Sequence, residues 1–379
     1  MQEQQNWPVI IVGAGLAGLT SAIHLSKMGI KVLLIEKENL PAHKVCGEYV
    51  SNEVLPYLDS LGFDPFAVGA TRINRLEVVL ASGKTIKTNM QLGGFGLSRY
   101  HFDYSLLQLA KSYGTTAIKA QVQQILFKDT VFTVNTQDGK TFKAAQVIAA
   151  YGKRSVLDKN LERPFFKQSA PFLAVKTHRK GDFPSDLVGL YNFKGGYCGI
   201  SCVEQNIINS CYIATYKSFK KHKNPEQFEQ EVLSQNPVLK QILEVTEPIF
   251  EKPLTISQIS FLNKPAVQKH ILFAGDAAGL IHPLCGNGMS MAIESAQLAS
   301  ELIIKFLKGQ IRRAELESSY KKQWNQKFKK RLNTGHYASK IMQDSRFSSV
   351  AFKGLKTAPF ILDALIKRTH GQILKPLAL

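Results

Sequence analysis

The sequence predicts an α/β fold built on a parallel sheet, with a second, mainly antiparallel sheet inserted into it and a helical tail after it. Three observations lead to this prediction. An apolar strand enters a glycine-rich turn and then a helix at the start of the chain, and a second strand–turn–helix unit lies near residue 275. Between them, short segments bounded by turn residues are typical of antiparallel strands.

Length and composition indicate a globular protein. Of the 379 residues, 44% are hydrophobic and 20% are charged, which is ordinary for soluble domains. We expect neither a membrane-spanning helix nor a secretory signal. The five cysteines show no Cys-x-x-Cys pair and no metal-binding spacing with histidine. We therefore expect a cytoplasmic protein without a disulfide framework and without a metal.

The first unit has the pattern of a dinucleotide-binding turn. The strand Val9–Val12 leads into Gly13-Ala14-Gly15-Leu16-Ala17-Gly18, a helix over residues 19–28 and a strand that ends at Glu36. In this pattern the glycines permit a tight turn, approach to a pyrophosphate and close packing of the helix on the strand. The helix N-terminus attracts phosphate, and Glu36 can accept hydrogen bonds from a ribose diol.

The second unit predicts that this dinucleotide is FAD. The strand at residues 271–274 enters Gly275-Asp276-Ala277-Ala278-Gly279, followed by Pro283, Gly286 and Gly288 and by a long helix to about residue 307. Asp276 can hold a chain of hydroxyls, and the glycines let backbone N–H groups approach a planar ring. Two nucleotide contacts about 260 residues apart suit one long ligand such as FAD better than NAD.

The remaining pattern sets the expected order of elements. We expect a helix near 52–61, a hairpin of 75–81 with 85–89, a loop at 93–96 before a helix over 102–113, and strands at 121–127, 131–136 and 147–150. Further strands are expected at 172–177, 187–193, 197–203 and 210–215, with a helix over 225–234. We assign residues 1–70, 95–165 and 262–310 to an FAD-binding domain, 71–94 and 166–261 to a substrate domain, and 311–379 to a basic helical C-terminal region.

These motifs resemble those of the flavoprotein superfamily that contains the FAD-dependent monooxygenases (single-component aromatic hydroxylases) and the geranylgeranyl reductases. The first unit with Glu36 is similar to its first FAD motif, and Gly275-Asp276 with the later glycines is similar to its ribityl and flavin motif. Arg99, ahead of a helix, is similar to an FAD-contacting arginine. The resemblance covers about residues 8–310. It implies a Rossmann-type FAD domain with an antiparallel sheet over the flavin.

Within that superfamily the chain resembles the geranylgeranyl reductase-like subgroup. Lys44-x-Cys46-Gly47-Glu48 and Gly195-Gly196-Tyr197 are similar to two of its segments. The chain departs from the wider pattern at Tyr151-Gly152-Lys153-Arg154-Ser155, a place linked to NAD(P)H or pyrophosphate contacts in some hydroxylases. The Trp-x-Trp segment of the halogenases is absent, and so is a second glycine-rich unit for NAD(P)H.

The predicted site residues fall into two sets. Those expected to contact FAD lie in or beside the motifs and are Gly13, Ala14, Gly15, Ala17, Gly18, Glu36, Lys37, Lys44, Arg99, Gly275, Asp276, Pro283, Gly286, Gly288 and Met289. The catalytic candidates are Cys46, Glu48 and His282. Cys46 is a proton donor or a small buried hydrophobe, and Glu48 is an acid or base or an exposed loop carboxylate. His282 stabilises reduced-flavin charge or has only a backbone role.

Two patterns concern partners. Aromatic residues on the inserted strands line a large apolar cavity or form an ordinary core; they are Phe172, Tyr191, Phe193, Tyr197 and Tyr212. The net charge is +19, and residues 301–379 hold 17 Lys and Arg against 5 Asp and Glu, a net of +12. Such a surface attracts an anionic membrane or an acidic carrier protein, or it is a solvated helix face. No nucleic acid is expected.

The apolar and basic residues after residue 346 alternate in a way that fits an amphipathic interfacial tail or packing against the protein body. The apolar members are Phe347, Phe352, Phe360, Ile361, Leu362 and Leu365, and the basic ones are Lys353, Lys356, Lys367 and Arg368. An interfacial tail would place the protein peripherally at the inner face of the membrane.

The sequence thus predicts an FAD-dependent oxidoreductase acting on a hydrophobic small molecule, with NAD(P)H as an external reductant. It leaves two reactions open: hydroxylation with O2 through a flavin peroxide, and reduction of an alkene in an isoprenoid or lipid chain. A third hypothesis is a membrane- or carrier-associated flavin-binding protein without either turnover.

Overall fold

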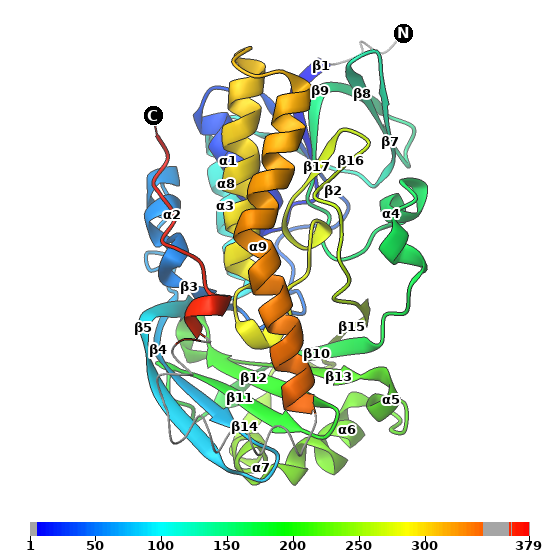
Figure 1. The fold of residues 1–379 in the computed structure, drawn as a ribbon. Coiled ribbons are helices and arrows are strands. Elements are labelled where there is room, and N and C mark those ends of the chain that lie inside the picture. The colour runs from blue at the N-terminus through cyan, green and yellow to red at the C-terminus, as the bar shows by residue number, and fades with distance from the viewer. Residues whose placement is uncertain (1–5, 344–363, 365, 379) are drawn as a thin grey trace.

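Two sheets stacked end to end form the molecule in the computed structural model, which describes residues 6–343, 364 and 366–378 (Figure 1). One sheet lies beside a layer of long helices, and the other lies below it with short helices on its far face. No helix of the described residues is long and apolar enough to cross a membrane.

The upper sheet has a parallel core in the order β17-β9-β1-β2-β6. Its strands are β1 (Asn6–Val12), β2 (Val32–Glu36), β6 (Thr116–Lys119), β9 (Thr141–Ala149) and β17 (Ile271–Phe273). Antiparallel additions at its edges are β7 (Val122–Lys128), β8 (Val131–Thr136) and β16 (Val267–Gln268). Strands β1 and β2 each bury four consecutive apolar residues, Val9–Val12 and Val32–Ile35, as parallel strands covered on both faces require.

Long helices cover one side of this sheet. They are α1 (Leu16–Lys27), α3 (Arg99–Ser112), α8 (Gly288–Leu307) and α9 (Arg313–Gln343), with the shorter α2 (Leu55–Leu61) and α4 (Val156–Asn160) at the margins (Figure 1). Helix α9 buries Leu316, Tyr320, Trp324 and Phe328 at intervals of four residues. That spacing places these four side chains on one face of α9, toward α8.

The lower sheet follows the order β14-β10-β13-β12-β11-β4-β5-β3, with β15 also on β10. Its strands are β3 (Tyr49–Ser51), β4 (Thr71–Val79), β5 (Thr85–Gly96), β10 (Phe172–Gly181), β11 (Leu187–Phe193), β12 (Gly196–Cys202), β13 (Ile208–Thr215), β14 (Thr246–Pro248) and β15 (Leu254–Ile259). Every neighbouring pair is antiparallel except β11 with β4. Below it lie α5 (Tyr216–Phe219), α6 (Pro225–Glu231) and α7 (Pro237–Glu244).

Short 3-10 turns complete the chain: η1 (Asn52–Val54), η2 (Pro164–Lys167), η3 (Glu204–Asn206), η4 (Leu233–Gln235), η5 (Gly275–Ala277) and η6 (Pro283–Cys285). The predicted fold class is confirmed, with the parallel unit, the inserted antiparallel strands and a helix after residue 311 all present. The domain boundaries at 70, 94, 165, 261 and 310 stay a prediction.

One expected loop is wrong. Residues 93–96 are the end of strand β5, not a loop before a helix. A Cβ at Gly94 would lie 2.5 Å from the Val50 carbonyl oxygen, and one at Gly96 would lie 1.9 Å from that of Cys202. The glycines therefore allow neighbouring strands to approach closely, a role that composition does not distinguish from a turn.

The end of the chain packs on the upper half. Glu53 is fully buried, and its side chain accepts hydrogen bonds from the Gly371 N–H (2.5 Å) and from Asn287 Nδ2 (3.1 Å). Its carbonyl accepts from the N–H of Leu374, whose side chain is buried. These contacts dock the end of the chain beyond the amphipathic pattern; most of that pattern, residues 347–368, lies outside the described residues, and both readings of it stay predictions.

We predict that Gly371→Val weakens this docking. A Cβ there would lie 2.7 Å from Arg331 Nη2 and 2.8 Å from Glu53 Oε1, and both groups are held in a buried ionic network. Overpacking of this kind costs about 1–3 kcal/mol. We expect a lower Tm and faster tryptic cleavage after Lys367 and Arg368. Gln372→Val, at an exposed neighbour, is the control, and equal cleavage rates in the two variants would contradict the prediction.

Candidate active site

The turn between β1 and α1 has the geometry of a phosphate site. Gly13 has φ of 104°, and a Cβ there would lie 2.5 Å from the Ala150 carbonyl oxygen. A Cβ at Gly18 would lie 1.9 Å from the Gly13 oxygen, whereas one at Gly15 would meet only Arg99 Nη2, at 3.7 Å. Gly15 is the N-cap and makes no side-chain capping bond. The first N–H groups of α1 therefore remain available to an anion.

Glu36 lies where β2 ends and is already bonded to this turn. Its Oε2 accepts a hydrogen bond from the Ala14 N–H at 2.6 Å, and its Oε1 accepts from the Lys37 and Glu38 N–H groups at 2.9 and 3.0 Å. Because a carboxylate has about four lone-pair sites, capacity remains for a diol. The Lys37 side chain is exposed and pairs with Glu38.

The start of α3 adds positive charge beside Gly15. Arg99 binds Asp103 through Nε and Nη2, both at 2.7 Å, and Lys44 binds the same carboxylate at 2.7 Å. Burial would raise the pKa of Asp103, but the charges of Arg99 and Lys44 hold it below its usual value. Two cations thus share one carboxylate, which leaves a net charge of about +1 facing the phosphate turn.

The second motif meets the first. Gly275 has φ of 61°, and a Cβ on it would lie 3.1 Å from the Cβ of Ala17 in helix α1. Burial raises the pKa of Asp276, against the charges of Lys264, Arg99 and Lys153. No described residue donates a hydrogen bond to its carboxylate, so that group can accept from a ligand. Two motifs that are distant in the sequence therefore lie side by side in the fold.

Two buried cationic side chains, Lys264 and Arg163, bind backbone carbonyls of the Asp276 turn. Lys264 Nζ donates to the Asp276 carbonyl at 2.8 Å and to that of Lys153 at 2.6 Å, and Arg163 donates to the Ala277 carbonyl at 2.8 Å. Burial lowers the pKa of Lys264 to about 8. The segment from Tyr151 to Ser155, where the sequence departs from the monooxygenase pattern, thus helps to hold the cofactor turn.

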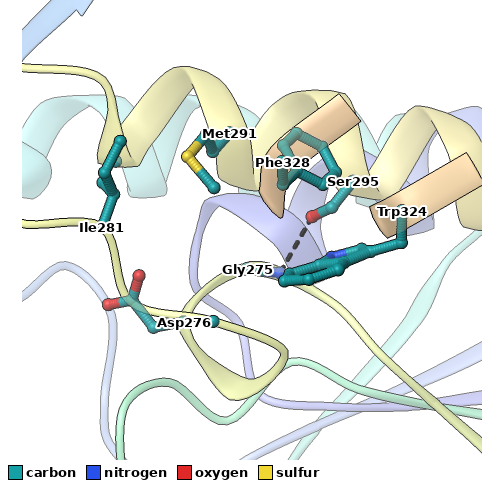
Figure 2. Close-up of a pocket in the computed structure, with 9 residues that line it drawn as sticks. Gly275, Asp276, Ile281, Met291, Ser295, Trp324 and Phe328 are labelled. Atoms are coloured by element: carbon teal, nitrogen blue, oxygen red, sulfur yellow. Dashed lines mark hydrogen bonds between the residues drawn. The ribbon is translucent and has the colours of Figure 1, made fainter. Parts of the chain in front are cut away.

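A small pocket lies behind this turn, between η5, α8 and α9 (Figure 2). The side chains around it leave no room for a bound ligand. Trp324 and Phe328 of α9 and Met291 and Ser295 of α8 line it, and Ser295 Oγ accepts a hydrogen bond from the Gly275 N–H at 2.8 Å. The pocket is a joint between α9 and the turn and is too small for FAD.

The loop before α8 contains the other predicted flavin contacts. Burial lowers the pKa of His282 to about 3, so its ring is neutral at physiological pH. Its Nδ1 accepts a hydrogen bond from the Leu284 N–H at 3.3 Å, which is the backbone role that the sequence left open. Pro283 begins η6, and Gly286 ends it with φ of 60°. Gly288 is the first residue of α8.

Cys46 lies against this loop. Its Sγ is 3.3 Å from Met289 Sδ, and its carbonyl accepts a hydrogen bond from Asn209 Nδ2 at 3.1 Å. Burial raises the pKa of the Cys46 thiol, so the sulfur is protonated at neutral pH. It can therefore donate a proton or contribute apolar surface, and it is not a thiolate nucleophile.

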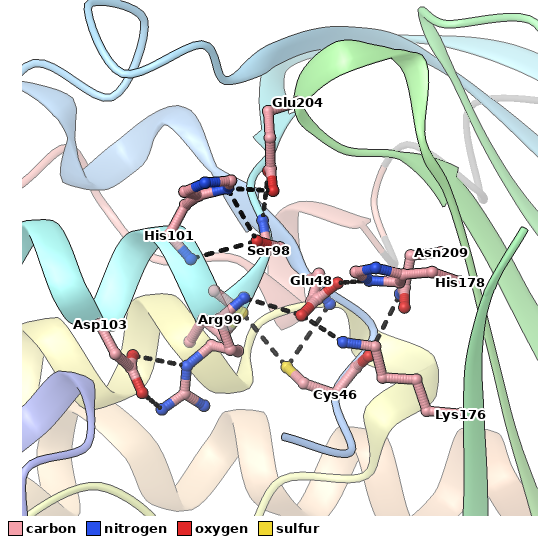
Figure 3. Close-up of polar contacts among 11 residues, drawn as sticks. Cys46, Glu48, Ser98, Arg99, His101, Asp103, Lys176, His178, Glu204 and Asn209 are labelled. Atoms are coloured by element: carbon pink, nitrogen blue, oxygen red, sulfur yellow. Dashed lines mark hydrogen bonds and ion pairs between the residues drawn. The ribbon is translucent and has the colours of Figure 1, made fainter. Parts of the chain in front are cut away.

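Glu48 is buried, so the reading of an exposed loop carboxylate is wrong. Its side chain accepts hydrogen bonds from the Arg99 N–H (2.7 Å), His178 Nε2 (2.8 Å) and Lys176 Nζ (Figure 3). Burial alone would raise the pKa of Glu48, but His178 and Lys176 hold it below its usual value. Its φ of 52° is uncommon for a residue with a side chain and is a mark of functional sites.

Sequence reasoning missed Lys176 and His178. Both lie on β10, and they alternate with Val175 and Thr177 along a strand that is buried over seven consecutive residues. Two polar residues at i and i+2 were the available signal, because they share one face of a strand. That face turns toward the Cys46 loop, as Figure 3 shows.

A second carboxylate joins the same two regions. Glu204, on η3, accepts hydrogen bonds from the Ser98 N–H at 2.8 Å and is 2.5 Å from His101 Nδ1 (Figure 3). Burial would raise the pKa of Glu204, but its hydrogen bonds with Ser98 and His101 hold it below its usual value. Glu48 and Glu204 therefore both bind the N-terminus of α3, where the helix dipole favours negative charge.

The lower sheet presents an apolar floor to the flavin loop. Phe172 and Tyr197 lie near His282, with ring centroids 6.4 and 6.0 Å away, and Phe261 lies 4.6 Å from it. Tyr191, Phe193 and Tyr212 instead lie in the core on the other side of the sheet. The core reading thus holds for these three, Phe172 and Tyr197 pack in a separate apolar cluster beside the flavin loop, and the large cavity stays a prediction.

Comparisons with known proteins agree with this geometry. A family model described as an FAD binding domain matches residues 6–330. A digeranylgeranylglycerophospholipid reductase of Methanococcus vannielii is 24% identical over 392 aligned positions, which cover 92% of this chain and 88% of that protein.

Two solved structures share the fold. A triple mutant of the flavin-dependent brominase Bmp2 has a TM-score of 0.79 at 19% identity, covering 96% of this chain and 94% of that one. A geranylgeranyl bacteriochlorophyll reductase-like protein from Thermoplasma acidophilum has a TM-score of 0.75 at 18% identity, covering 98% and 94%.

We predict that Glu36→Gln weakens FAD binding about tenfold or more, because hydrogen bonds to a charged group contribute about 1.5–3 kcal/mol. The dissociation constant is measured by fluorescence quenching on adding FAD to the apoprotein. Glu38→Gln is the matched control. It removes one negative charge two residues from Glu36, and the Glu38 side chain is 64% exposed. An unchanged affinity for FAD in Glu36→Gln would show that the Glu36 carboxylate does not bind the ribose.

Proposed function

The chain belongs to the FAD binding domain family, and from this premise we propose that it is a reductase that saturates an alkene in an isoprenoid or other lipid chain. The family is one of FAD-dependent oxidoreductases, so the hypothesis of a flavin-binding protein without turnover is not carried forward. The observation that carries the proposal is the continuous apolar floor of the lower sheet.

That floor extends beyond the aromatic cluster. Leu190 packs both with the group that contains Tyr197 and with the group that contains Tyr49 and Met90. Apolar side chains therefore run without interruption from the flavin loop across β12, β11 and β4 to β5. An elongated hydrocarbon fits such a surface, because its burial is favourable by about 25 cal/mol per Å² wherever it lies on it.

The residues of this chain supply binding and orientation. FAD, when bound, provides hydride chemistry. The α1 N-terminus and Arg99 would hold the diphosphate, and Asp276 would accept hydrogen bonds from the ribityl hydroxyls. The neutral ring of His282 and the protonated Cys46 thiol add no charge of their own beside the flavin loop. The apolar floor excludes water from the reacting alkene.

The name of the Methanococcus vannielii relative, a reductase of a lipid that carries geranylgeranyl chains, supports the same proposal. We further propose that the electrons come from NAD(P)H acting without a nucleotide-binding domain of its own. The chain has a single glycine-rich Gly-x-Gly-x-x-Gly turn, so the nicotinamide would have to approach the flavin through the substrate side.

The surface of α9 supports a further proposal, that the protein works at an anionic membrane. Lys321, Lys322, Lys329 and Lys330 are exposed on α9. Other members of the basic run are used internally: Lys327 and Arg331 bind Glu294 at 2.8 and 2.7 Å. The four exposed lysines would attract anionic lipid headgroups by about 1 kcal/mol each.

The reaction type is tested by reoxidation. The FAD-loaded protein is reduced anaerobically, with NADPH and NADH in separate runs, and is then mixed with O2 in a stopped-flow spectrometer. We expect O2 to reoxidise the flavin slowly and without a transient near-ultraviolet band. We expect a polyprenyl lipid, added anaerobically before O2, to reoxidise the flavin faster because the lipid is turned over. A transient oxygen-adduct band that a bound substrate accelerates would instead favour hydroxylation.

The membrane proposal is tested by cosedimentation with phosphatidylserine vesicles. Changing Lys321, Lys322, Lys329 and Lys330 to Gln should reduce binding at least tenfold, and salt should do the same to the unmodified protein. The control changes four exposed lysines below the lower sheet to Gln, namely Lys217, Lys220, Lys221 and Lys223. Equal losses in the two variants would show a non-specific charge effect and end the proposal.

A further inference from the structure

The middle of the lower sheet contains a glycine that neither packing nor backbone conformation requires. Gly199 lies in the interior of β12, which pairs with β11 on one side and with β13 on the other. Its φ is not positive. Among the described residues, the atoms that a Cβ there would approach most closely are the Cys211 carbonyl oxygen at 3.8 Å and Leu190 Cδ2 at 3.9 Å. Because glycine weakens the interior of a strand, its presence calls for a different reason.

Two other glycines of the same sheet have the structural reason that Gly199 lacks. A Cβ on Gly196, also in β12, would lie 2.0 Å from the Ile213 carbonyl oxygen, and one on Gly189 in β11 would lie 2.2 Å from Tyr191 Oη. Both contacts are far shorter than atoms allow, so these two positions exclude any side chain. At Gly199 the same space is open.

This open space lies on the face of the sheet that is directed at the cofactor loop. Gly199 is partly exposed, although its strand has neighbours on both sides. Cys198 and Ile200, whose side chains point to the opposite face, are buried. Tyr197 shares the face of Gly199, because residues two apart in a strand point the same way, and its ring lies near His282. The accessible surface of Gly199 is therefore on the substrate side.

Partly exposed residues continue in line with Gly199 across four strands. The register places Cys211 of β13, Leu190 of β11 and Val78 of β4 in one row with it, and all of them are partly exposed. The row covers three steps between strands, about 14 Å. The residues that flank the row on the same face of β12 and β13 are buried, namely Tyr197, Ser201, Asn209 and Ile213.

We propose that Gly199 determines substrate specificity: the side chain that it lacks leaves a trough along this row, in which one hydrocarbon chain of the substrate lies across β13, β12, β11 and β4. This inference deepens the proposed function, on which it rests for the isoprenoid character of the chain. The trough itself requires only an apolar ligand.

The surface of the trough suits hydrocarbon and not the polar parts of FAD. Leu190 and Val78 present only hydrocarbon. Burial raises the pKa of the Cys211 thiol, so this group is uncharged and acts as a small apolar side chain. The residues expected to contact FAD lie elsewhere, on α1, α3 and the loop before α8. A hydrocarbon chain in the trough leaves water without leaving a polar group of its own unpaired.

The space above Gly199 favours a branched chain. A carbon atom at the Cβ position would be at ordinary van der Waals distance from Cys211 and Leu190, so a methyl branch of the ligand can occupy that position. Isoprenoid chains carry a methyl branch in every repeat unit, whereas unbranched fatty chains carry none. The geometry therefore discriminates between two classes of lipid chain.

One end of the trough is closed. The register partner of Cys211 on β10 is Lys176, whose side chain is fully buried and ion-paired with Glu48. An apolar chain cannot displace that pair without leaving a buried charge unpaired, which is costly. At the other end Val78 packs with the apolar cluster that contains Met90. The chain therefore ends at β10 and extends toward β4 and β5.

The test is binding of geranylgeraniol, which is branched, and of oleyl alcohol, which is not, to the FAD-loaded protein by isothermal titration calorimetry. Gly199→Leu fills the trough and should weaken binding of both alcohols about tenfold or more. Gly199→Ala adds only the carbon at the branch position, so it should weaken geranylgeraniol about fivefold and spare oleyl alcohol. Thr133→Leu is the control and should bind both normally, because Thr133 is a partly exposed residue of β8, a strand that is also paired on both sides.

Two measurements without lipid check that Gly199 is not a structural residue. The affinity for FAD should be equal in the unmodified protein and the three variants. The Tm of Gly199→Ala should equal or exceed that of the unmodified protein, because alanine loses less backbone entropy than glycine on folding. A lower Tm in Gly199→Ala, or a loss of FAD affinity in Gly199→Leu alone, overturns the trough. If Gly199→Leu does not fold, Gly199→Val replaces it.

The lipid results separate the trough from the proposed function. Unmodified protein that binds neither alcohol overturns the trough, and so does Gly199→Leu that binds both as tightly as the unmodified protein. Weaker binding in Gly199→Leu, with equal effects of Gly199→Ala on the two alcohols, keeps the trough and overturns its preference for a branched chain. The expected pattern of binding in a protein that reduces no alkene keeps the trough and overturns the reductase.

Discussion

The carboxylate of Glu48 is the contact on which the arrangement of the two sheets depends. It belongs to the cofactor half of the chain and accepts hydrogen bonds from a helix N-terminus on that side and from two side chains of the inserted sheet. Removing one partner of a buried ionic pair typically costs about 3–5 kcal/mol, so the substrate sheet cannot drift relative to α3 without a large penalty. The left-handed backbone at Glu48 is the local strain that lets the carboxylate point back into the joint.

The same joint ties the cofactor turn to the substrate floor. On the cofactor side, Gly275 packs closely against Ala17, so the phosphate turn and the Asp276 turn are in direct contact. On the substrate side, Lys176 and His178 lie on one strand with Phe172 and Ala174, on the same face. A ligand that bridges the two turns is therefore held at one position relative to the apolar floor of the lower sheet. Alkene reduction needs such registration, because the hydride must travel a short distance in one direction.

The cofactor half was predictable because its signals are local. Gly13 follows β1 directly, Gly18 lies in the first turn of α1, and Asp276 lies three residues after β17, so the strand–turn–helix order fixes where they lie. Lys176 and His178 were not predictable, because β10 also contains Arg179 and Lys180, and alternation alone cannot tell which face is buried. Only the pairing of β10 with β13, and the Cys46 loop above it, decides the matter. The loop predicted at residues 93–96 was wrong for the same reason, because the backbone that Gly94 and Gly96 approach belongs to segments distant in the sequence.

The basic tail shows how position changes the meaning of a charge. By composition the lysine-rich run is one surface, but the fold divides it. Lys327 and Arg331 turn inward to Glu294, and Trp324 and Phe328 press α9 against the Asp276 turn. The exposed lysines on the same helix face solvent. A membrane that bound them would thus act on a helix whose opposite side touches the cofactor turn, so the lipid surface and the flavin site share one rigid element.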